Sequence, residues 1–168
     1  MSLVRRATTE DAGEVLRLRQ VMIDALPGGD ASTAWHTEAL PSLRRKLAEA
    51  DGDFAAFVVD HPERPGALGA LVAGTVDYRI GKAGNPHGLA GYVFSVATDP
   101  TARRWGSPRA RLFERGGGYA RACMDELLAW FRERGAGQVM LTASPEAEPL
   151  YVSLGFVHKP DPTMILKL

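Results

Sequence analysis

A stretch rich in arginine and glycine contains the residue types best suited to binding an anion. Residues 99–121 hold six arginines against two acids, although the whole chain is neutral, with 20 basic and 20 acidic residues. The stretch leads into the run Arg115-Gly116-Gly117-Gly118-Tyr119-Ala120, just before the clearest helical pattern. Glycines at a helix start let backbone N–H groups converge on an anion, with the helix dipole behind them. The pattern predicts a phosphate or pyrophosphate cradle; the alternative is a flexible loop with solvated arginines.

The residues after the glycines argue against two common nucleotide-binding motifs. A P-loop places Lys and then Ser or Thr after its last glycine, whereas Tyr119 and Ala120 stand here. A dinucleotide fingerprint needs a third glycine where Arg121 stands, and an acid about 20 residues further on at the end of a strand. We therefore expect neither an ATPase nor a nicotinamide-dependent enzyme.

The elements that must position this stretch follow from hydrophobic periodicity. Residues 121–135 carry apolar side chains at helical spacing, and residues 89–98 alternate as a strand does. Residues 54–60 and 68–79 form a hairpin with that strand as the third of a meander. In the first third of the chain we predict a strand over 4–7, a helix between the Thr8-Thr9 cap and Pro27, and a helix over 35–50 in which Pro41 causes an irregular start or a break. In the last third we predict a strand over 139–142, a helix over 145–154 capped by Ser144, and strands over 156–158 and 164–168.

The order of these elements predicts an α/β (α+β) fold in one domain over residues 1–168. Cys123 is the only cysteine, so neither an internal disulfide nor a cysteine-based zinc site is expected, and a reducing, cytoplasmic location fits. The four histidines show no ligand spacing, and we predict no metal. The neutral charge argues against nucleic acid and anionic membranes as partners. The longest apolar run, residues 66–76, is too short to span a bilayer.

Two motifs in the second half resemble those of the GCN5-related N-acetyltransferases. Arg115, Gly118 and Ala120 fit the family's acetyl-CoA motif, Q/R-x-x-G-x-G/A, at the start of its central helix. Residues 147–156 fit its A-x-x-L-Y-x-x-x-G-F segment, and residues 96–100 look like the end of its fourth strand. The resemblance runs across the whole chain and is strongest over residues 92–157. It implies a mixed, mostly antiparallel sheet of six to seven strands flanked by about four helices.

The sequence departs from the family pattern in one place. Fourteen residues separate Pro100 from Arg115, where relatives have only a few. Residues 103–106, Arg-Arg-Trp-Gly, compete for the first half of the motif, but no helical pattern follows them. We therefore prefer Arg115. The insertion over 101–114 is either a basic lid over the coenzyme's phosphates or a disordered segment.

The resemblance implies acetyl-CoA as co-substrate and assigns its contacts. Backbone groups of Val96, Ala97 and Thr98 would face the pantetheine and the acetyl oxygen. The N–H groups from Gly116 to Arg121 would bind the pyrophosphate. Tyr151 would act as general acid toward the sulfur, with packing of the last helix as its alternative role. Ser144 would contact the coenzyme or serve only as a helix cap.

Several assignments stay open at this point. Asp77, Glu38 and Tyr92 are candidates for the general base, and water can serve instead. The acceptor is an amine of a small molecule or a peptide, and a homodimer is compatible with the resemblance. Cys123 lies on the apolar face of its helix, so we expect a core residue. The alternative functions are a non-catalytic acyl-CoA-binding or regulatory module and, with less support, a nucleic-acid binder that uses the arginines.

Overall fold

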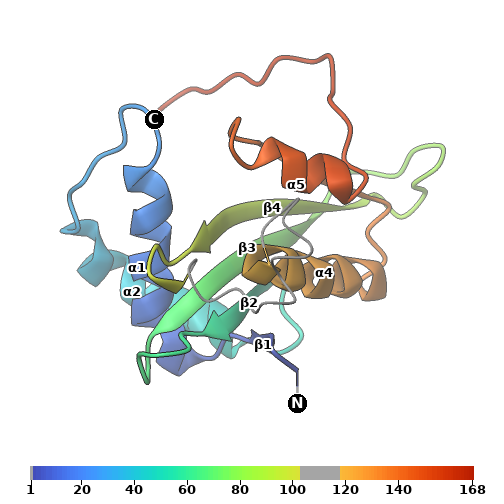
Figure 1. Cartoon of the computed structure of the whole chain (residues 1–168). Helices are drawn as coiled ribbons and strands as arrows, with labels where there is room; N and C mark the ends of the chain where they lie inside the picture. Colours follow the sequence, from blue (N-terminus) through green and yellow to red (C-terminus); the bar gives the residue numbers. More distant parts are fainter. Residues whose placement is uncertain (1, 103–117) are drawn as a thin grey trace.

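One mixed sheet forms the centre of the fold (Figure 1). The computed structural model describes residues 2–102 and 118–168. Within them five strands form a sheet in the order β1-β2-β3-β4-β5, and only β4 and β5 run parallel. This mixed α+β class is the one predicted, with a smaller sheet than expected. The strands are β1 (Arg5–Arg6), β2 (Phe54–Asp60), β3 (Leu68–Tyr78), β4 (Leu89–Thr98) and β5 (Gln138–Leu141).

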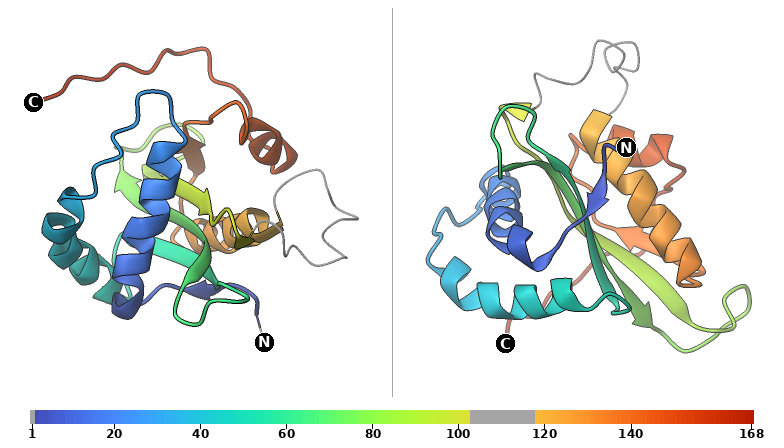
Figure 2. Two further views of the ribbon diagram at one scale, coloured as in Figure 1. Left: turned by 60° about the vertical axis from the view of Figure 1, so that its left-hand side comes forward. Right: turned by 90° about the horizontal axis from the view of Figure 1, so that it is seen from below.

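Helices cover both faces of the sheet (Figure 2). A 3₁₀ turn, η1, precedes the first helix. On one face α1 and α2 pack around Leu18, Val58 and Leu71, whereas α4 and α5 pack on the other face around Val72, Leu127 and Phe131. The bounds are η1 (Thr9–Asp11), α1 (Ala12–Asp24), α2 (Trp35–Ala48), α4 (Gly118–Glu133) and α5 (Glu148–Ser153).

The predicted meander is confirmed almost residue for residue. β2, β3 and β4 match the expected strands at all but one terminal position. The register places Phe54 opposite Thr75, and Thr75 opposite Tyr92. These strands are rich in Val, Phe and Ala, and the proline and glycine residues between them cannot continue a strand.

Pro41 does not break its helix, so of the two effects expected from sequence, an irregular start or a break, the break is wrong. α2 runs through it from Trp35 to Ala48. Proline has no N–H to donate to the carbonyl four residues earlier, that of Thr37. Both Pro41 and Thr37 are exposed, so water can reach this unpaired carbonyl.

The two final strands predicted from sequence are absent from the described residues. Residues 156–168 have no strand pairing, and every residue from 157 onward is exposed. A strand requires a neighbour that accepts and donates its backbone hydrogen bonds. No strand of the described ranges, 2–102 and 118–168, pairs with these residues, so β propensity alone does not make them a strand.

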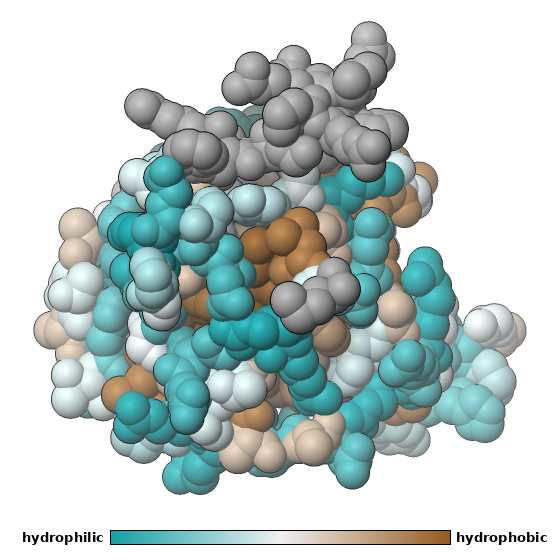
Figure 3. All heavy atoms as spheres, turned by 60° about the horizontal axis from the view of Figure 1, so that its bottom comes forward, coloured by the Kyte–Doolittle hydropathy of each residue, from teal (hydrophilic) through white to brown (hydrophobic). Residues whose placement is uncertain are grey.

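The surface mixes hydrophilic and hydrophobic areas. The face in Figure 3 is largely hydrophilic around one central patch of hydrophobic side chains. Among the helices of the described residues, none combines the length and the hydrophobicity that crossing a bilayer requires.

Candidate active site

β4 and β5 part in the middle of the sheet. They pair from Ala90 opposite Gln138 to Val93 opposite Leu141, where β5 ends. β4 continues to Thr98 and pairs only with β3 over this last part, as far as the structure describes the chain. The outer backbone edge of residues 94–98 is therefore available to a ligand.

A β-bulge lies at the start of this open edge. Leu71 pairs with Ala97 and Ala73 pairs with Phe94, so Ser95 and Val96 together face Val72. Ser95 adopts a φ of 56°, in the left-handed region that residues other than glycine rarely enter. A guanidinium N–H of Arg19 in α1 donates to Ser95 Oγ. The bulge bends β4 away from β5.

The backbone direction on this edge follows from one hydrogen bond. The Asp99 N–H donates to the Gly69 carbonyl on the β3 side at 2.8 Å. Alternate residues of an antiparallel strand turn their N–H groups to opposite sides. The N–H of Thr98 therefore turns away from β3, toward the gap. Val96 and Ala97, the other two residues predicted here, pack into opposite faces of the sheet.

The start of α4 lies next to the end of β4 in both views of Figure 2. Its first turn contains Gly118, Tyr119, Ala120 and Arg121, and the preceding Arg115, Gly116 and Gly117 of the predicted motif lie outside the described residues. The first N–H groups of a helix have no partner within it, which suits an anion. Ala120 is buried in the core on the α4 side.

The side chain of Arg121 makes a contact that sequence reasoning did not anticipate. Its guanidinium donates to Ser153 Oγ at 2.6 Å, and this hydroxyl donates to the Leu150 carbonyl at 2.6 Å. The first turn of α4 is thereby tied to α5.

Tyr151 lies in α5, in the same core cluster as Ala120. It is 5% exposed and packs edge-to-face on Phe156, with ring centroids 6.0 Å apart. Burial raises the pKa of the Tyr151 phenol above its ordinary value, because a phenolate would lose its hydration. The phenol therefore keeps its proton at neutral pH, as a proton donor must.

Ser144 does not cap the last helix, contrary to prediction. α5 begins at Glu148, after a turn in which the Ser144 carbonyl accepts the N–H groups of Ala147 and Glu148 at 3.1 and 3.0 Å. The residue at the cap position is Ala147, which has no side-chain acceptor. The Ser144 hydroxyl has no capping role, because the helix starts too late for it.

Tyr92 is the one base candidate that the structure brings to the gap. Its hydroxyl lies 3.3 Å from Thr142 Oγ1, just beyond the end of β5. Asp77 pairs opposite Ala90, further from the open part of β4, and its carboxylate lies 3.5 Å from the Arg79 guanidinium. Glu38 is exposed on α2.

Cys123 is a core residue, as its place on the helix predicted. It is fully buried, and burial raises the pKa of its thiol to about 12, so it stays protonated. Among the described residues, no three His, Cys, Asp or Glu side chains come together as a metal site would require.

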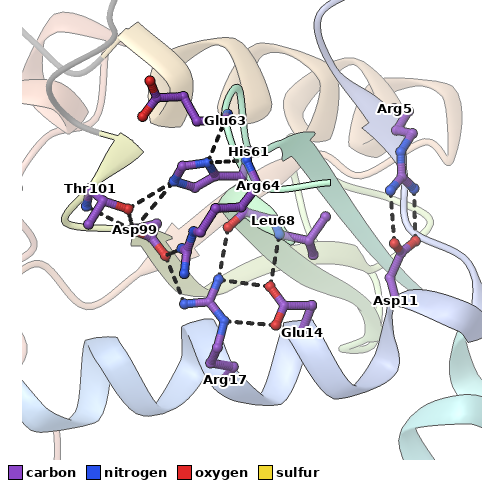
Figure 4. Close-up of polar contacts among 10 residues, drawn as sticks. All are labelled: Arg5, Asp11, Glu14, Arg17, His61, Glu63, Arg64, Leu68, Asp99 and Thr101. Atoms are coloured by element: carbon purple, nitrogen blue, oxygen red, sulfur yellow. Dashed lines mark hydrogen bonds and ion pairs between the residues drawn. The ribbon is translucent and has the colours of Figure 1, made fainter. Parts of the chain in front are cut away.

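A polar cluster that sequence reasoning missed holds the end of β4 (Figure 4). Asp99 is 2% exposed and accepts hydrogen bonds from Arg17 of α1 at 2.8 Å and from Arg64 of the β2–β3 connection. Arg17 also binds Glu14 at 2.8 Å and the Leu68 carbonyl at 3.0 Å. We call this set, with His61 and Thr101, the Asp99 cluster.

His61 and Thr101 complete the Asp99 cluster. His61 Nδ1 accepts the N–H groups of Glu63 and Arg64, both at 3.1 Å, so its proton is on Nε2. Nε2 then donates to Thr101 Oγ1 at 2.9 Å, and this hydroxyl donates to Asp99 Oδ1 at 2.6 Å. In this chain of hydrogen bonds, each donor therefore faces an acceptor.

The hydrogen bonds and charges of the Asp99 cluster favour the ionised form of the Asp99 side chain. Burial alone would raise the pKa of Asp99, but hydrogen bonds from Thr101 and Arg17 outweigh it and hold the pKa far below its ordinary value. The spacing Asp99-Pro100-Thr101 is the feature of the sequence that could have revealed part of this, because an Asp commonly accepts the N–H two residues on. That bond is present at 2.8 Å.

The sequence matches no protein-family model and no curated protein. The fold, however, matches 108 chains of solved structures. A GCN5-related N-acetyltransferase from Ralstonia eutropha JMP134 is 25% identical, with a TM-score of 0.72 and coverage of 97% of both chains. A predicted acetyltransferase from Clostridium acetobutylicum, solved with acetyl-CoA, is 22% identical, with a TM-score of 0.72 and coverage of 99% of this chain and 96% of that one.

A more distant enzyme has the same fold. Glucosamine-6-phosphate N-acetyltransferase from Arabidopsis thaliana is 15% identical, with a TM-score of 0.66 and coverage of 97% of this chain and 96% of that one. The matched region includes nearly the whole length of each of these proteins, so the similarity extends well beyond the two motifs.

Proposed function

We propose that the chain is a GCN5-related N-acetyltransferase, and that it transfers the acetyl group of acetyl-CoA directly to an amine of a small molecule or a peptide. The parting of β4 from β5 carries this proposal. It leaves the main-chain groups on the outer side of residues 94–98, beside the start of α4, without a strand partner among the described residues. An extended pantetheine arm can take the place of the missing strand, because it carries amide groups along its length.

The residues of the chain divide the binding task. The N–H of Thr98 and its neighbours on the open edge would hold the acetyl oxygen and the pantetheine. The first turn of α4, from Gly118 to Arg121, would hold the pyrophosphate with the helix dipole. The buried Asp99 cluster keeps the end of β4 in place while these bonds form.

The reaction then needs orientation and two proton movements. The amine nitrogen forms a bond to the thioester carbon, the carbon–sulfur bond breaks, and the nitrogen loses a proton while the sulfur gains one. Backbone donors aimed at the carbonyl oxygen stabilise the charge that develops on it. Tyr151 donates to the sulfur, and Tyr92 or a water at the mouth of the gap accepts the proton of the amine.

Calorimetric titration of acetyl-CoA into the protein tests the binding step. We expect saturable binding that Gly118→Glu abolishes, because the added carboxylate repels the pyrophosphate at the start of α4. Gly13→Glu is the matched control, since the space around this exposed glycine of α1 is open. No binding to the wild type, or equal binding to both variants, would overturn the proposed site.

Tyr151→Phe tests the general acid. We expect kcat to fall about 100-fold, the lower range for loss of an acid–base group, with the affinity for acetyl-CoA unchanged. Tyr78→Phe is the control, because Tyr78 is exposed at the far end of β3. Unchanged turnover of Tyr151→Phe would contradict the assignment. Binding of acetyl-CoA by the wild type without turnover on a broad panel of amines would favour the non-catalytic module.

A further inference from the structure

A cationic side chain lies on the α1 face of the sheet, at the gap between β4 and β5. Arg19 of α1 is half-buried, and its guanidinium donates to Ser95 Oγ at the bulge of β4. Ser95 is 5% exposed and directly precedes Val96, on the open edge proposed to bind the acetyl group and the pantetheine. Consecutive Cα atoms lie about 3.8 Å apart. The charge of Arg19 is therefore anchored next to the site of acetyl transfer.

Among the described residues, no acidic partner accompanies this charge. Ser95 Oγ is the one acceptor that this part of the chain gives the Arg19 guanidinium, and none of its carboxylates forms an ion pair with it. Arg17, two residues earlier in α1, is the contrast, because Glu14 and Asp99 both bind it at 2.8 Å (Figure 4). A guanidinium bonded to a neutral hydroxyl keeps its full charge and further N–H donors, which suits it to an anionic partner.

Arg121 shows the same pattern on the other face of the sheet. Its guanidinium donates to Ser153 Oγ at 2.6 Å, and it has no ion pair with a carboxylate of the ranges that the structure describes. Arg121 lies in the first turn of α4, where the pyrophosphate is proposed to bind, so its charge has an anion to meet. The coenzyme held there does not account for Arg19, which lies under α1.

The two faces of the sheet separate the two substrates. α4 covers one face and α1 covers the other (Figure 2). A coenzyme whose pyrophosphate is held at the start of α4 approaches the gap from the α4 side. Direct transfer requires the amine to be bound at the same time, so the amine approaches from the side that the coenzyme leaves open. That side is the α1 face, which holds Arg19.

Two aromatic rings lie on the same face as Arg19. Tyr92 and Phe94 stack along β4 with ring centroids 6.5 Å apart, and Phe94 packs on the core under α1. Both residues are half-buried, so part of each side chain is accessible. The Tyr92 hydroxyl, a candidate base, lies at the gap beside Thr142. The α1 face of the gap therefore offers aromatic surface beside one fixed positive charge.

We propose that Arg19 binds an anionic group of the acceptor, and that the acceptor is an amine with a carboxylate or phosphonate a few bonds from its nitrogen. This inference rests on the proposed acetyl transfer and specifies its substrate class. The planar guanidinium matches two oxygens of such a group. Because Arg19 is anchored next to the site of transfer, a short molecule such as an amino acid fits both, whereas a polyamine is repelled. The bound anion orients the amine toward the thioester carbon.

Matched pairs of acceptors test the charge requirement. Leucine, phenylalanine and β-alanine are each compared with the corresponding carboxamide, and 2-aminoethylphosphonate is compared with ethanolamine. In each pair that is acetylated, we expect kcat/KM to be about 10- to 100-fold higher for the anionic member, as charge-assisted hydrogen bonds imply. The neutral member has the less basic amine, so more of it is unprotonated, and ionisation of the amine cannot produce this preference. Equal values, or higher values for the neutral members, would overturn the proposal.

Arg19→Gln separates recognition of the acceptor from support of the bulge. Glutamine removes the charge but keeps an N–H donor for Ser95 Oγ, so kcat/KM should fall for the anionic members and stay nearly unchanged for the neutral ones. Arg19→Lys should recover part of the preference. Arg45→Gln is the control, because Arg45 is exposed in the last turn of α2, and it should leave the preference intact. A purely structural role of Arg19 would lower both members alike, and an unchanged ratio would contradict the assignment.

A binding measurement keeps this inference separate from the proposed activity. Calorimetry on protein saturated with coenzyme A compares each acid with its carboxamide in the absence of acetyl transfer. If the acids bind more tightly and Arg19→Gln removes the difference, but no amine is acetylated, the proposed activity fails and the role of Arg19 stands. If amines are acetylated with no preference for an anion, the role of Arg19 fails and the activity stands. Neither preference nor turnover would overturn both.

Discussion

The Asp99 cluster at the end of β4 and the last residues of the chain, 157–168, which we call the tail, are built in opposite ways. At the end of β4, the buried Asp99 accepts bonds from two arginines and a threonine, and His61 has partners on both ring nitrogens. In the tail, strongly apolar side chains are exposed, and no strand among the described residues pairs with them. The polar groups of the first region are paired within one chain, whereas the apolar side chains of the second region face solvent.

This difference predicts that the two regions contribute differently to the stability of the fold. The Asp99 cluster joins α1, the β2–β3 connection and β4, so its loss is expected to act on the stability of a single chain. The tail contacts α5 only at the surface, where His158 lies 3.0 Å from a Glu148 oxygen, so changes at its apolar side chains are expected to leave the unfolding free energy almost unchanged. Variants of the two regions are therefore expected to differ in how much stability they cost.

Among the variants of the Asp99 cluster and of the tail, the largest effect is expected from Asp99→Asn. It removes a buried charge and replaces one of the two acceptor oxygens with an NH₂ group, which cannot accept from Arg17, Arg64 or Thr101. Because both arginines are partly exposed, we expect a loss of about 2 to 3 kcal/mol of unfolding free energy. Asp60→Asn is the control, since Asp60 is mostly exposed beside Arg5 and should cost less than about 1 kcal/mol. Urea unfolding measures both. Equal losses would mean that the Asp99 cluster does not hold the fold.

Lowering the pH should gradually remove the contribution of the Asp99 carboxylate to the unfolding free energy. The pKa of Asp99 is lower in the folded than in the unfolded state, so its stabilisation is complete above about pH 4 and is lost as the pH falls toward the folded value. The stability gap between wild type and Asp99→Asn should therefore narrow below about pH 4, by up to about 1.4 kcal/mol per pH unit. Urea titrations at pH 7 and pH 3 measure it, and a constant gap would contradict the assignment.

Thr101→Val should have a smaller effect. It keeps the side-chain shape but removes the hydroxyl between His61 and Asp99, leaving the buried Nε2 without its acceptor. We expect a loss of about 1 to 2 kcal/mol. Thr101→Ser restores the hydroxyl and should recover most of it. If the serine variant is as unstable as the valine variant, the bond is not the cause.

The smallest effect is expected in the tail. Leu166→Ser should change the unfolding free energy by less than about 0.5 kcal/mol, because the side chain is already exposed. Leu71→Ala, at a fully buried site, should cost about 2 to 5 kcal/mol under the same conditions. A large loss from Leu166→Ser would show that the tail packs within its own chain.

The sequence predicted the parts of the fold whose patterns are local. The meander, the long helix after residue 117 and the burial of Cys123 follow from hydrophobic spacing, because each pattern depends on a few neighbouring residues. The prediction that Pro41 breaks its helix was wrong. The free-energy cost of a proline depends on whether water reaches the unpaired carbonyl, and the sequence pattern does not show that exposure. The final strands were wrong because β propensity does not say which edge is available.

The candidate site was predicted as residue types and not as geometry. Tyr151 and the start of α4 follow from the motifs, whereas the bulge at Ser95 and its contact with Arg19 depend on register between distant strands. The Asp99 cluster joins residues 14 to 101, and only the short Asp99-to-Thr101 turn is local. Long-range polar pairing of this kind leaves little trace in a single sequence.

The way the chain is held on both sides of residues 103–117 bears on protein engineering. Ala102 is fully buried, and its N–H donates to the Asp99 carbonyl at 3.0 Å, while the first turn of α4 is fixed separately through Arg121 and Ser153. Residues 2–102 and 118–168 thus contribute two complementary halves of one core. The boundary between them is a natural place to split the protein into two fragments that reassemble, as in a reporter of protein proximity.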